Sequence, residues 1–302
     1  MGRNKQRHRS KNVVEMKSRT ENSRIIHTHI APKERTAGHR WGEVWRYRDL
    51  VFLLTKKTFT LQYKQTILGP LWSVIYPLCT SAIMTIVFGR IAKIDTAGVP
   101  HILFYLLTNA LWGFFSACVN TNSRTFVDNA YLFGKVYFPR LTVPISNALY
   151  HLIGFCIQLA IVIPLSVFFF VRGRITPHYE WAWLLPLILL QTGLLGIGTG
   201  ILLSSATTKY RDLMILVTVG IQMWMYLSPV IYPVSQVANP LLKTVLAVNP
   251  MTAPLECIRF IMTGKGQILP VSVVSAVLCS VFALFLGAWV FGRVEKTFMD
   301  TV

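Results

Sequence analysis

The sequence predicts an all-α integral membrane protein with six membrane-spanning helices. Three observations support this prediction: the composition is apolar, long uncharged segments recur, and an amphipathic segment precedes the first of them. Of the 302 residues, 53% are hydrophobic and 14% are charged, whereas about 25% of the residues in a typical soluble protein are charged. This shortage of charge points to lipid, and the length allows one helical bundle.

Six segments are long and apolar enough to cross about 30 Å of hydrocarbon, a distance that takes about 20 helical residues. Their approximate bounds are 71–91, 102–119, 143–170, 181–206, 213–231 and 271–291. The fourth segment contains Gly196 and Gly200, and small residues at this spacing permit close contact between helices.

Residues 1–40 form a polar, basic segment that has no apolar periodicity and is predicted to be a disordered tail. The membrane domain is then expected to span 41–302. Residues 1–70 hold 16 Lys and Arg against 5 Asp and Glu. Basic flanks favour the cytoplasmic side, so an even number of spans places both termini there. No nucleic-acid partner is expected, because the tail lacks interleaved aromatic residues.

The segment 41–60 is predicted to be an amphipathic helix lying in the membrane interface. At 100° per residue, one sector collects Trp41, Val44, Trp45, Phe52 and Phe59. A helix of a soluble core is the alternative interpretation of the same pattern. The interface is favoured because a membrane span follows directly.

The 39 residues 232–270, between the fifth and sixth spans, are too apolar for a solvated loop and are interrupted by five prolines. We expect short re-entrant helices, which need protein or a water-filled cavity around their backbone. An outer surface loop with two interfacial helices is the alternative.

The residues indicate neither catalysis nor cofactor binding. The chain has no GxxxxGK[ST] phosphate-binding loop, and its five cysteines stand singly in apolar stretches. We therefore expect no metal, no cofactor and no catalytic residue. His151 is the ionisable side chain well inside a span, and a neutral histidine bonded to a neighbouring helix is favoured over a functional group.

Several short motifs occur in order along the chain: 61–78 (LQYKQTILGPLWSVIYPL), 135–141 (KVYFPRL), 210–213 (YRDL), 228–233 (SPVIYP) and 249–259 (NPMTAPLECIR). Together they resemble the permease subunits of bacterial ABC transporters that export O-antigen, teichoic acid or capsule. The resemblance implies a homodimer in the bacterial cytoplasmic (inner) membrane. It also implies two copies of a cytoplasmic ATPase that binds the ATP, and a lipid-linked polysaccharide as cargo.

Two other functions share parts of this pattern. An ABC exporter of drugs or of another lipid has the same six-span plan, but the YKQTILGPLW motif and the aromatic richness disfavour it. A membrane enzyme acting on lipid-linked sugars is disfavoured because carboxylates and histidines are scattered.

The first motif predicts a corner where the chain turns from the membrane plane into the membrane, with Tyr63, Lys64, Gln65, Gly69 and Pro70 as its residues. Tyr and Lys suit the interface. Gly69 and Pro70 are expected to end the interface helix and to begin the next helix.

Aromatic side chains of the first and fifth spans are candidates for the sugar path, because aromatic faces pack on the apolar faces of pyranose rings. These candidates are Trp72, Tyr76, Trp224, Tyr226 and Tyr232. Lipid-facing aromatic belts at the two interfaces are the alternative.

The loop between the second and third spans is predicted to contain a short helix. Thr125 and Asp128 have the spacing of a capping box, and Phe126, Ala130 and Phe133 follow one apolar face. Because so short a helix needs a packing partner, and the resembling family has a coupling helix here, we expect contact with the ATPase. The alternative is docking on the membrane or on the chain's own interface helix.

Overall fold

The computed structural model describes residues 42, 44–64, 67, 69–136 and 138–299. These residues form helices and connecting turns, and no strand occurs among them. This confirms the predicted all-α class. The predicted basic tail 1–40 lies outside the described residues, as do Trp41 and Gln65.

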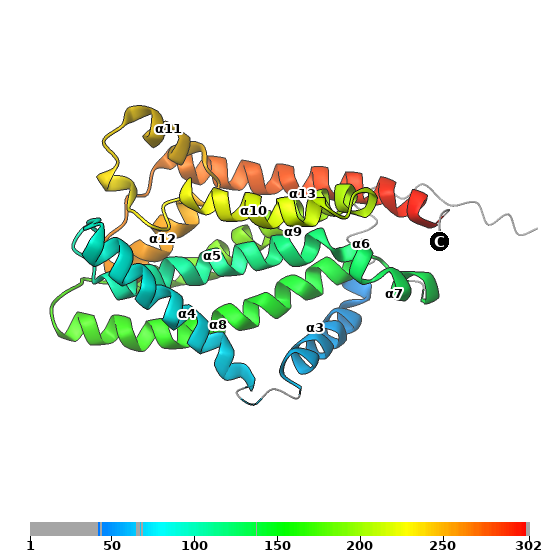
Figure 1. Ribbon diagram of the computed structural model, residues 1–302, viewed down its shortest axis with the longest axis horizontal. Coiled ribbons are helices and arrows are strands. Elements are labelled where there is room, and N and C mark those ends of the chain that lie inside the picture. Colours follow the sequence, from blue (N-terminus) through cyan, green and yellow to red (C-terminus); the bar gives the residue numbers. More distant parts are fainter. Residues whose placement is uncertain (1–41, 43, 65–66, 68, 137, 300–302) are drawn as a thin grey trace, which may run out of the picture. The chain divides into compact units, whose positions relative to one another are not determined.

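The helices follow one another with short connections (Figure 1). Their bounds are α3 Arg48–Tyr63, η1 Gly69–Leu71, α4 Trp72–Met84, η2 Thr85–Ile91, α5 His101–Ser123, α6 Thr125–Asp128, α7 Ala130–Lys135, α8 Thr142–Val171, η3 Tyr179–Leu184, α9 Leu185–Lys209, α10 Leu213–Tyr226, η4 Val234–Gln236, α11 Pro240–Val248, α12 Thr252–Thr263 and α13 Pro270–Met299.

Five of the predicted spans are helices that are long and apolar enough to cross a membrane: Trp72–Ile91, His101–Ser123, Thr142–Val171, Tyr179–Lys209 and Pro270–Val294. The predicted fifth span is shorter than expected. Its helix, α10, stops at Tyr226 rather than at 231, and at about 1.5 Å per residue it is only about 21 Å long. The physical reason is Pro229, which disfavours helix at Ser228 and offers no N–H to the preceding turn.

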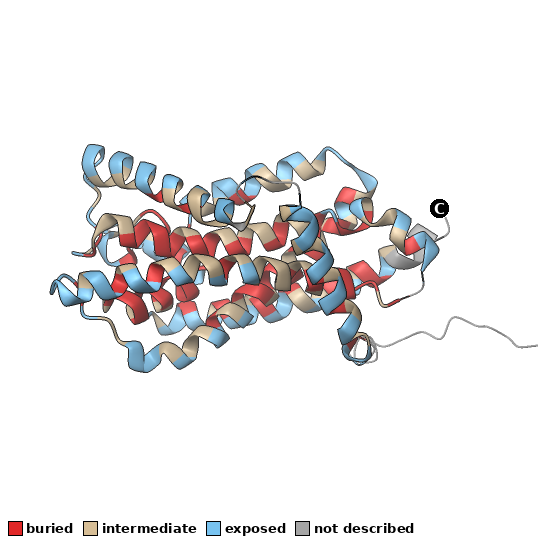
Figure 2. Ribbon diagram, turned by 90° about the horizontal axis from the view of Figure 1, so that it is seen from below, coloured by how far each residue is buried: buried red, intermediate tan, exposed pale blue. Residues whose placement is uncertain are grey.

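The helix α9 packs closely on both α5 and α13, and these three are called the central helices below. Buried residues gather in the interior of the bundle (Figure 2). Glycines bring them together. A Cβ atom on Gly200 would lie 2.5 Å from the Asn122 side chain on α5, and one on Gly198 would lie 2.5 Å from the Leu284 backbone nitrogen on α13. The close contact predicted for Gly196 and Gly200 is confirmed, whereas the contact through Gly198 was not predicted.

The helix α3 packs on α8 through a narrow face, in which Val51 and Thr55 are buried and Thr55 Oγ1 donates a hydrogen bond to the Ser146 carbonyl. Trp45 and Phe52 from the predicted apolar sector are 73% and 64% exposed. An apolar face that stays uncovered beside a membrane span fits a helix of the interface.

The helices α11 and α12 are bent by 91° at a short break and lie at the end of the bundle opposite α6 and α7 (Figure 1). The predicted short helices between prolines are therefore confirmed. The described helices that are long and apolar enough to cross a membrane number five, or six if the bent pair is one span. Which end faces the cytoplasm stays a prediction.

Candidate functional site

The corner between α3 and α4 forms as predicted, with one correction. The interface helix already ends at Tyr63, where Lys64 turns to an extended conformation with ψ 130°, and Gly69 adopts φ +49° before the next helix begins. Gly69 and Pro70 therefore start the span but do not end α3. The two helices diverge strongly from this corner (Figure 1).

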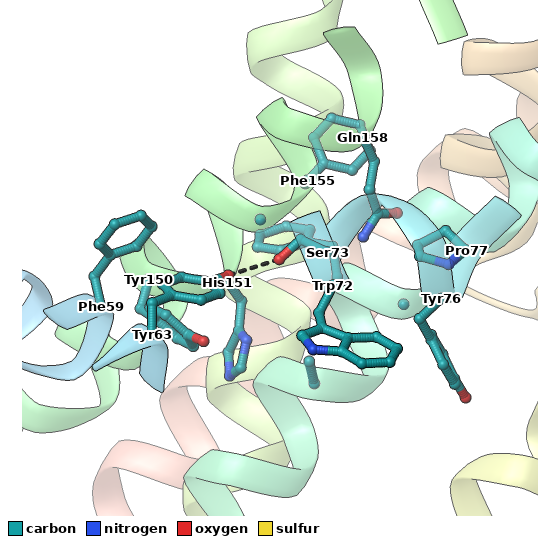
Figure 3. Close-up of a pocket in the computed structure, with 14 residues that line it drawn as sticks. Phe59, Tyr63, Trp72, Ser73, Tyr76, Pro77, Tyr150, His151, Phe155 and Gln158 are labelled. Atoms are coloured by element: carbon teal, nitrogen blue, oxygen red, sulfur yellow. Dashed lines mark hydrogen bonds between the residues drawn. The ribbon is translucent and has the colours of Figure 1, made fainter. Parts of the chain in front are cut away.

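A cavity of about 170 Å³ lies beside this corner, between α3, α4, α5 and α8 (Figure 3). Two predicted path residues, Trp72 and Tyr76, contribute to its walls, together with Phe59, Tyr63 and Tyr150. Trp72 and Tyr76 are 53% and 70% exposed. Their rings are thus available to a ligand or to lipid.

Two hydrogen bonds fix the polar side chains of the cavity. The hydroxyl oxygens of Tyr63 and Ser73 lie 2.6 Å apart, which closes the corner. On the opposite wall, His151 Nε2 lies 2.8 Å from Thr121 Oγ1 of α5. The predicted bond from His151 to a neighbouring helix is confirmed.

The other three path candidates lie elsewhere. Trp224 packs edge-on against Phe115 of α5, with ring centroids 5.2 Å apart, and its Nε1 donates to Asn249 Oδ1 over 3.3 Å. The Tyr232 hydroxyl donates to the Tyr226 carbonyl over 3.0 Å. The structure therefore places the five aromatics in two groups, one on α4 and one around the C-terminal end of α10. Their role in a sugar path stays a prediction.

The loop between the second and third spans differs from the predicted single helix. It forms two short helices, α6 and α7, that break at Asn129. The predicted capping box is absent, since Thr125 Oγ1 donates to the Asn122 carbonyl over 2.8 Å instead of capping a helix. Asp128 is exposed and ends α6.

The apolar face of this loop is covered by the chain itself. Phe126 is fully buried and stacks on Phe291 of α13, with ring centroids 4.3 Å apart. Phe133 is buried too and contacts Phe126 edge-on, while Ala130 is partly exposed. The expectation that this face is free for a partner is wrong, because α13 extends far enough to pack against it.

A different part of the loop is exposed. Tyr131 is 75% exposed, and the Lys135 ammonium group lies 3.9 Å from the centre of its ring. Val136 follows and is exposed as well. This exposed surface, formed by Tyr131, Lys135 and Val136, is available to a partner protein.

A buried ion pair on α12 was not predicted. Arg259 Nη1 lies 2.5 Å from Glu256 Oε1, and both side chains are 1% exposed. Glu256 also accepts the backbone N–H groups of Val234 and Gln267, and Arg259 donates to the Pro229 carbonyl. The available signal was the i, i+3 spacing of opposite charges in an otherwise apolar helix.

Comparison with known proteins places these features in a family. Residues 49–263 match the model of the ABC-2 type transporter. Two O-antigen export system permease proteins RfbA of Klebsiella pneumoniae are 28% and 26% identical, covering 68% and 83% of this chain and 76% and 94% of their own length. An RfbA permease of Myxococcus xanthus is 24% identical over 70% of this chain and 79% of its own. Because the family model covers most of the chain and its helices have the expected order, the protein belongs to the ABC-2 type transporter family.

Proposed function

We propose that this chain is the permease subunit of an ABC transporter that exports a lipid-linked cell-surface polysaccharide of the O-antigen class. The single observation that carries the proposal is the similarity to RfbA permeases along most of both chains. The aromatic cavity supports it, because aromatic faces and neutral polar groups suit sugars.

The proposed assembly is a homodimer in the bacterial cytoplasmic membrane, with both termini in the cytoplasm and two copies of a separate ATPase. Uncovered apolar faces on α4 and α10 support the homodimer, because these helices leave large side chains such as Ile83 and Leu216 exposed. ATP binding and hydrolysis belong to the partner subunit. The permease contributes the path through the membrane.

The force from the ATPase is proposed to enter through the exposed surface of Tyr131, Lys135 and Val136. Behind this surface, Phe126 stacks on α13, and Thr207 of α9 donates a hydrogen bond to the Ser123 carbonyl at the end of α5. Close-packed contacts transmit displacement rather than absorbing it. A push on α7 is therefore delivered to all three central helices.

The coupling surface is tested by Tyr131→Ala with Lys135→Ala, compared with Phe126→Ala with Phe133→Ala. The first pair removes exposed side chains, so the permease should fold normally and fail to stimulate the ATPase. The second pair opens cavities in the protein's own core and should lower the amount of folded permease. Normal ATPase stimulation by the first variant contradicts the assignment.

The export function is tested in a strain that lacks its O-antigen permease but retains the matching ATPase and glycan synthesis. Expression of this chain should restore O-antigen on the cell surface and remove the lipid-linked glycan that accumulates inside. An ATPase variant unable to hydrolyse ATP serves as the control. Restored growth without glycan export contradicts the proposal. Export that continues with the ATPase variant unable to hydrolyse ATP contradicts it as well.

A further inference from the structure

Gln158 is a polar residue near the middle of the long span α8, about 19 Å or more along the helix from either end. Its side chain is half-buried and lines the cavity beside the corner. Among the residues that the structure describes, its amide has no hydrogen-bond partner. An amide at this depth is costly without a partner, and this half-buried amide is open to a partner from outside the chain.

Other amides within the bundle are paired between helices. Gln191 of α9 donates to Ser280 Oγ of α13 over 2.9 Å. Asn147 of α8 donates to Asn122 Oδ1 of α5 over 3.1 Å, and Asn120 Oδ1 accepts from Thr218 of α10. Gln222 of α10 also has no described partner, but it is exposed and does not line this cavity. Gln158 is thus set apart because it lines a cavity.

The walls around Gln158 determine which ligand fits. Figure 3 shows its amide directed into the space on the side where Trp72 and Tyr76 lie. No Lys, Arg, Asp or Glu lines the cavity, so a phosphate would find no opposite charge. A lipid tail would leave the amide unpaired. A ring that carries hydroxyl groups on its edge and C–H groups on its faces satisfies both kinds of wall.

We propose that this cavity is a subsite for one neutral sugar ring of the exported glycan, in which the Gln158 amide bonds ring hydroxyls and Trp72 packs on the ring face. The inference rests on the proposed export function and deepens it. The amide offers two donors and an acceptor, and the His151–Thr121 and Tyr63–Ser73 pairs hold the surrounding walls in place. The subsite adjoins the corner where the chain enters the membrane.

The first test is photocrosslinking in cells that contain the full chain, its ATPase and the glycan. A photoreactive phenylalanine analogue replaces Tyr76 at the mouth of the cavity, an exchange of one aromatic ring for another. The control position is Phe285, which is 62% exposed on α13 and does not line the cavity. We expect a glycan-containing adduct, detected with antibody to the glycan, at Tyr76 and none at Phe285.

The second test is Gln158→Met, which keeps the length of the side chain and removes its polar groups. Export per folded permease should fall by about two- to tenfold, the effect of one or two lost hydrogen bonds. The Gln158→Asn variant keeps an amide and should retain part of the export activity. Thermal stability of the empty permease should not fall, because no bond within the chain is lost. Ile153→Met on the same helix is the matched control.

The outcomes separate the two proposals. If the wild-type chain exports glycan but the Tyr76 position yields adducts with phospholipid alone, the subsite is wrong and the export function stands. A Gln158→Met variant that exports normally, or that loses stability as a structural residue would, also overturns the subsite. If the wild-type chain exports no glycan at all, both proposals fail together.

Discussion

The spans α4 and α5 differ greatly in burial although both are apolar enough to cross a membrane. In the most apolar window of each span, 72% of the residues of α5 are buried inside the protein, against 11% for the span that begins with α4. α5 meets the glycines of α9, whereas α4 presents Trp72, Tyr76 and Ile83 outward. The comparison teaches that apolar composition predicts insertion into the membrane, while small residues on a neighbour determine which span becomes the core.

The largest effect is expected from Glu256→Ala, on the buried side of this comparison. The change leaves the Arg259 guanidinium without its carboxylate, although that group still lies 4.2 Å from the centre of the Phe104 ring on α5. Losing one partner of a buried pair costs about 3–5 kcal/mol of folding free energy. Thermal unfolding in detergent measures the loss, with exposed Glu180→Ala as the control. Equal stability of the two variants would show that the pair does not hold α12.

A smaller loss is expected from Gly198→Leu, which forces a side chain against the α13 backbone. Overpacking of this kind costs about 1–3 kcal/mol. Gly220→Leu on α10 is the matched control, because a Cβ atom there meets nothing within 4 Å. The measurement is the yield of monodisperse protein together with its unfolding temperature. If both variants behave alike, glycine contacts do not define the central helices.

On the exposed side, Trp72→Ala with Tyr76→Ala should change stability by less than about 0.5 kcal/mol, as is usual for surface positions. Surface O-antigen should nevertheless decrease, because the rings are proposed to contact sugar. Ile83→Ala with Ile86→Ala removes exposed aliphatic groups of the same span as a control. Should the aromatic and the aliphatic pairs give equal export, the rings form a lipid-facing belt.

The smallest effect on folding is expected from the test of the topology prediction, because its two reporter positions lie outside the spans. In a background in which all five cysteines are replaced by alanine, single cysteines at Asp95 and Tyr131 report on opposite ends of the bundle. Both positions are exposed, unlike the neighbouring Thr96 and Thr125, which are buried. An impermeant reagent added to whole cells should label Asp95→Cys and not Tyr131→Cys. Labelling of both from outside would refute six crossings.

The sequence predicted what depends on local patterns. Span positions follow from length and hydropathy, the short helices α11 and α12 follow from prolines, and the contact at Gly196 and Gly200 follows from spacing. The early end of α10 was missed although Pro229 was visible, because the apolar residues continue past it.

Contacts between residues that are far apart in the sequence could not be predicted in the same way. An apolar face on a loop requires a partner, but periodicity does not say whether that partner is another protein or the same chain. Phe126 meets Phe291, which is far away in sequence. The lack of a partner for the Gln158 amide could not be predicted for a related reason. Whether a glutamine in a span is hydrogen-bonded depends on its neighbours on other helices, which the sequence does not show.

Asn249 shows how tightly two distant parts of the fold are joined. Its Oδ1 accepts from Trp224 Nε1 and from the Met251 backbone N–H, while its Nδ2 donates to the Leu227 carbonyl and to Ser228 Oγ. One planar amide thus holds the last turn of α10 and the bend between α11 and α12 in a single register. A rotation of α10 by one residue breaks several of these bonds at once, and each buried group left unpaired costs about 1–3 kcal/mol. We therefore expect α10 and the pair α11 and α12 that follows it to move together.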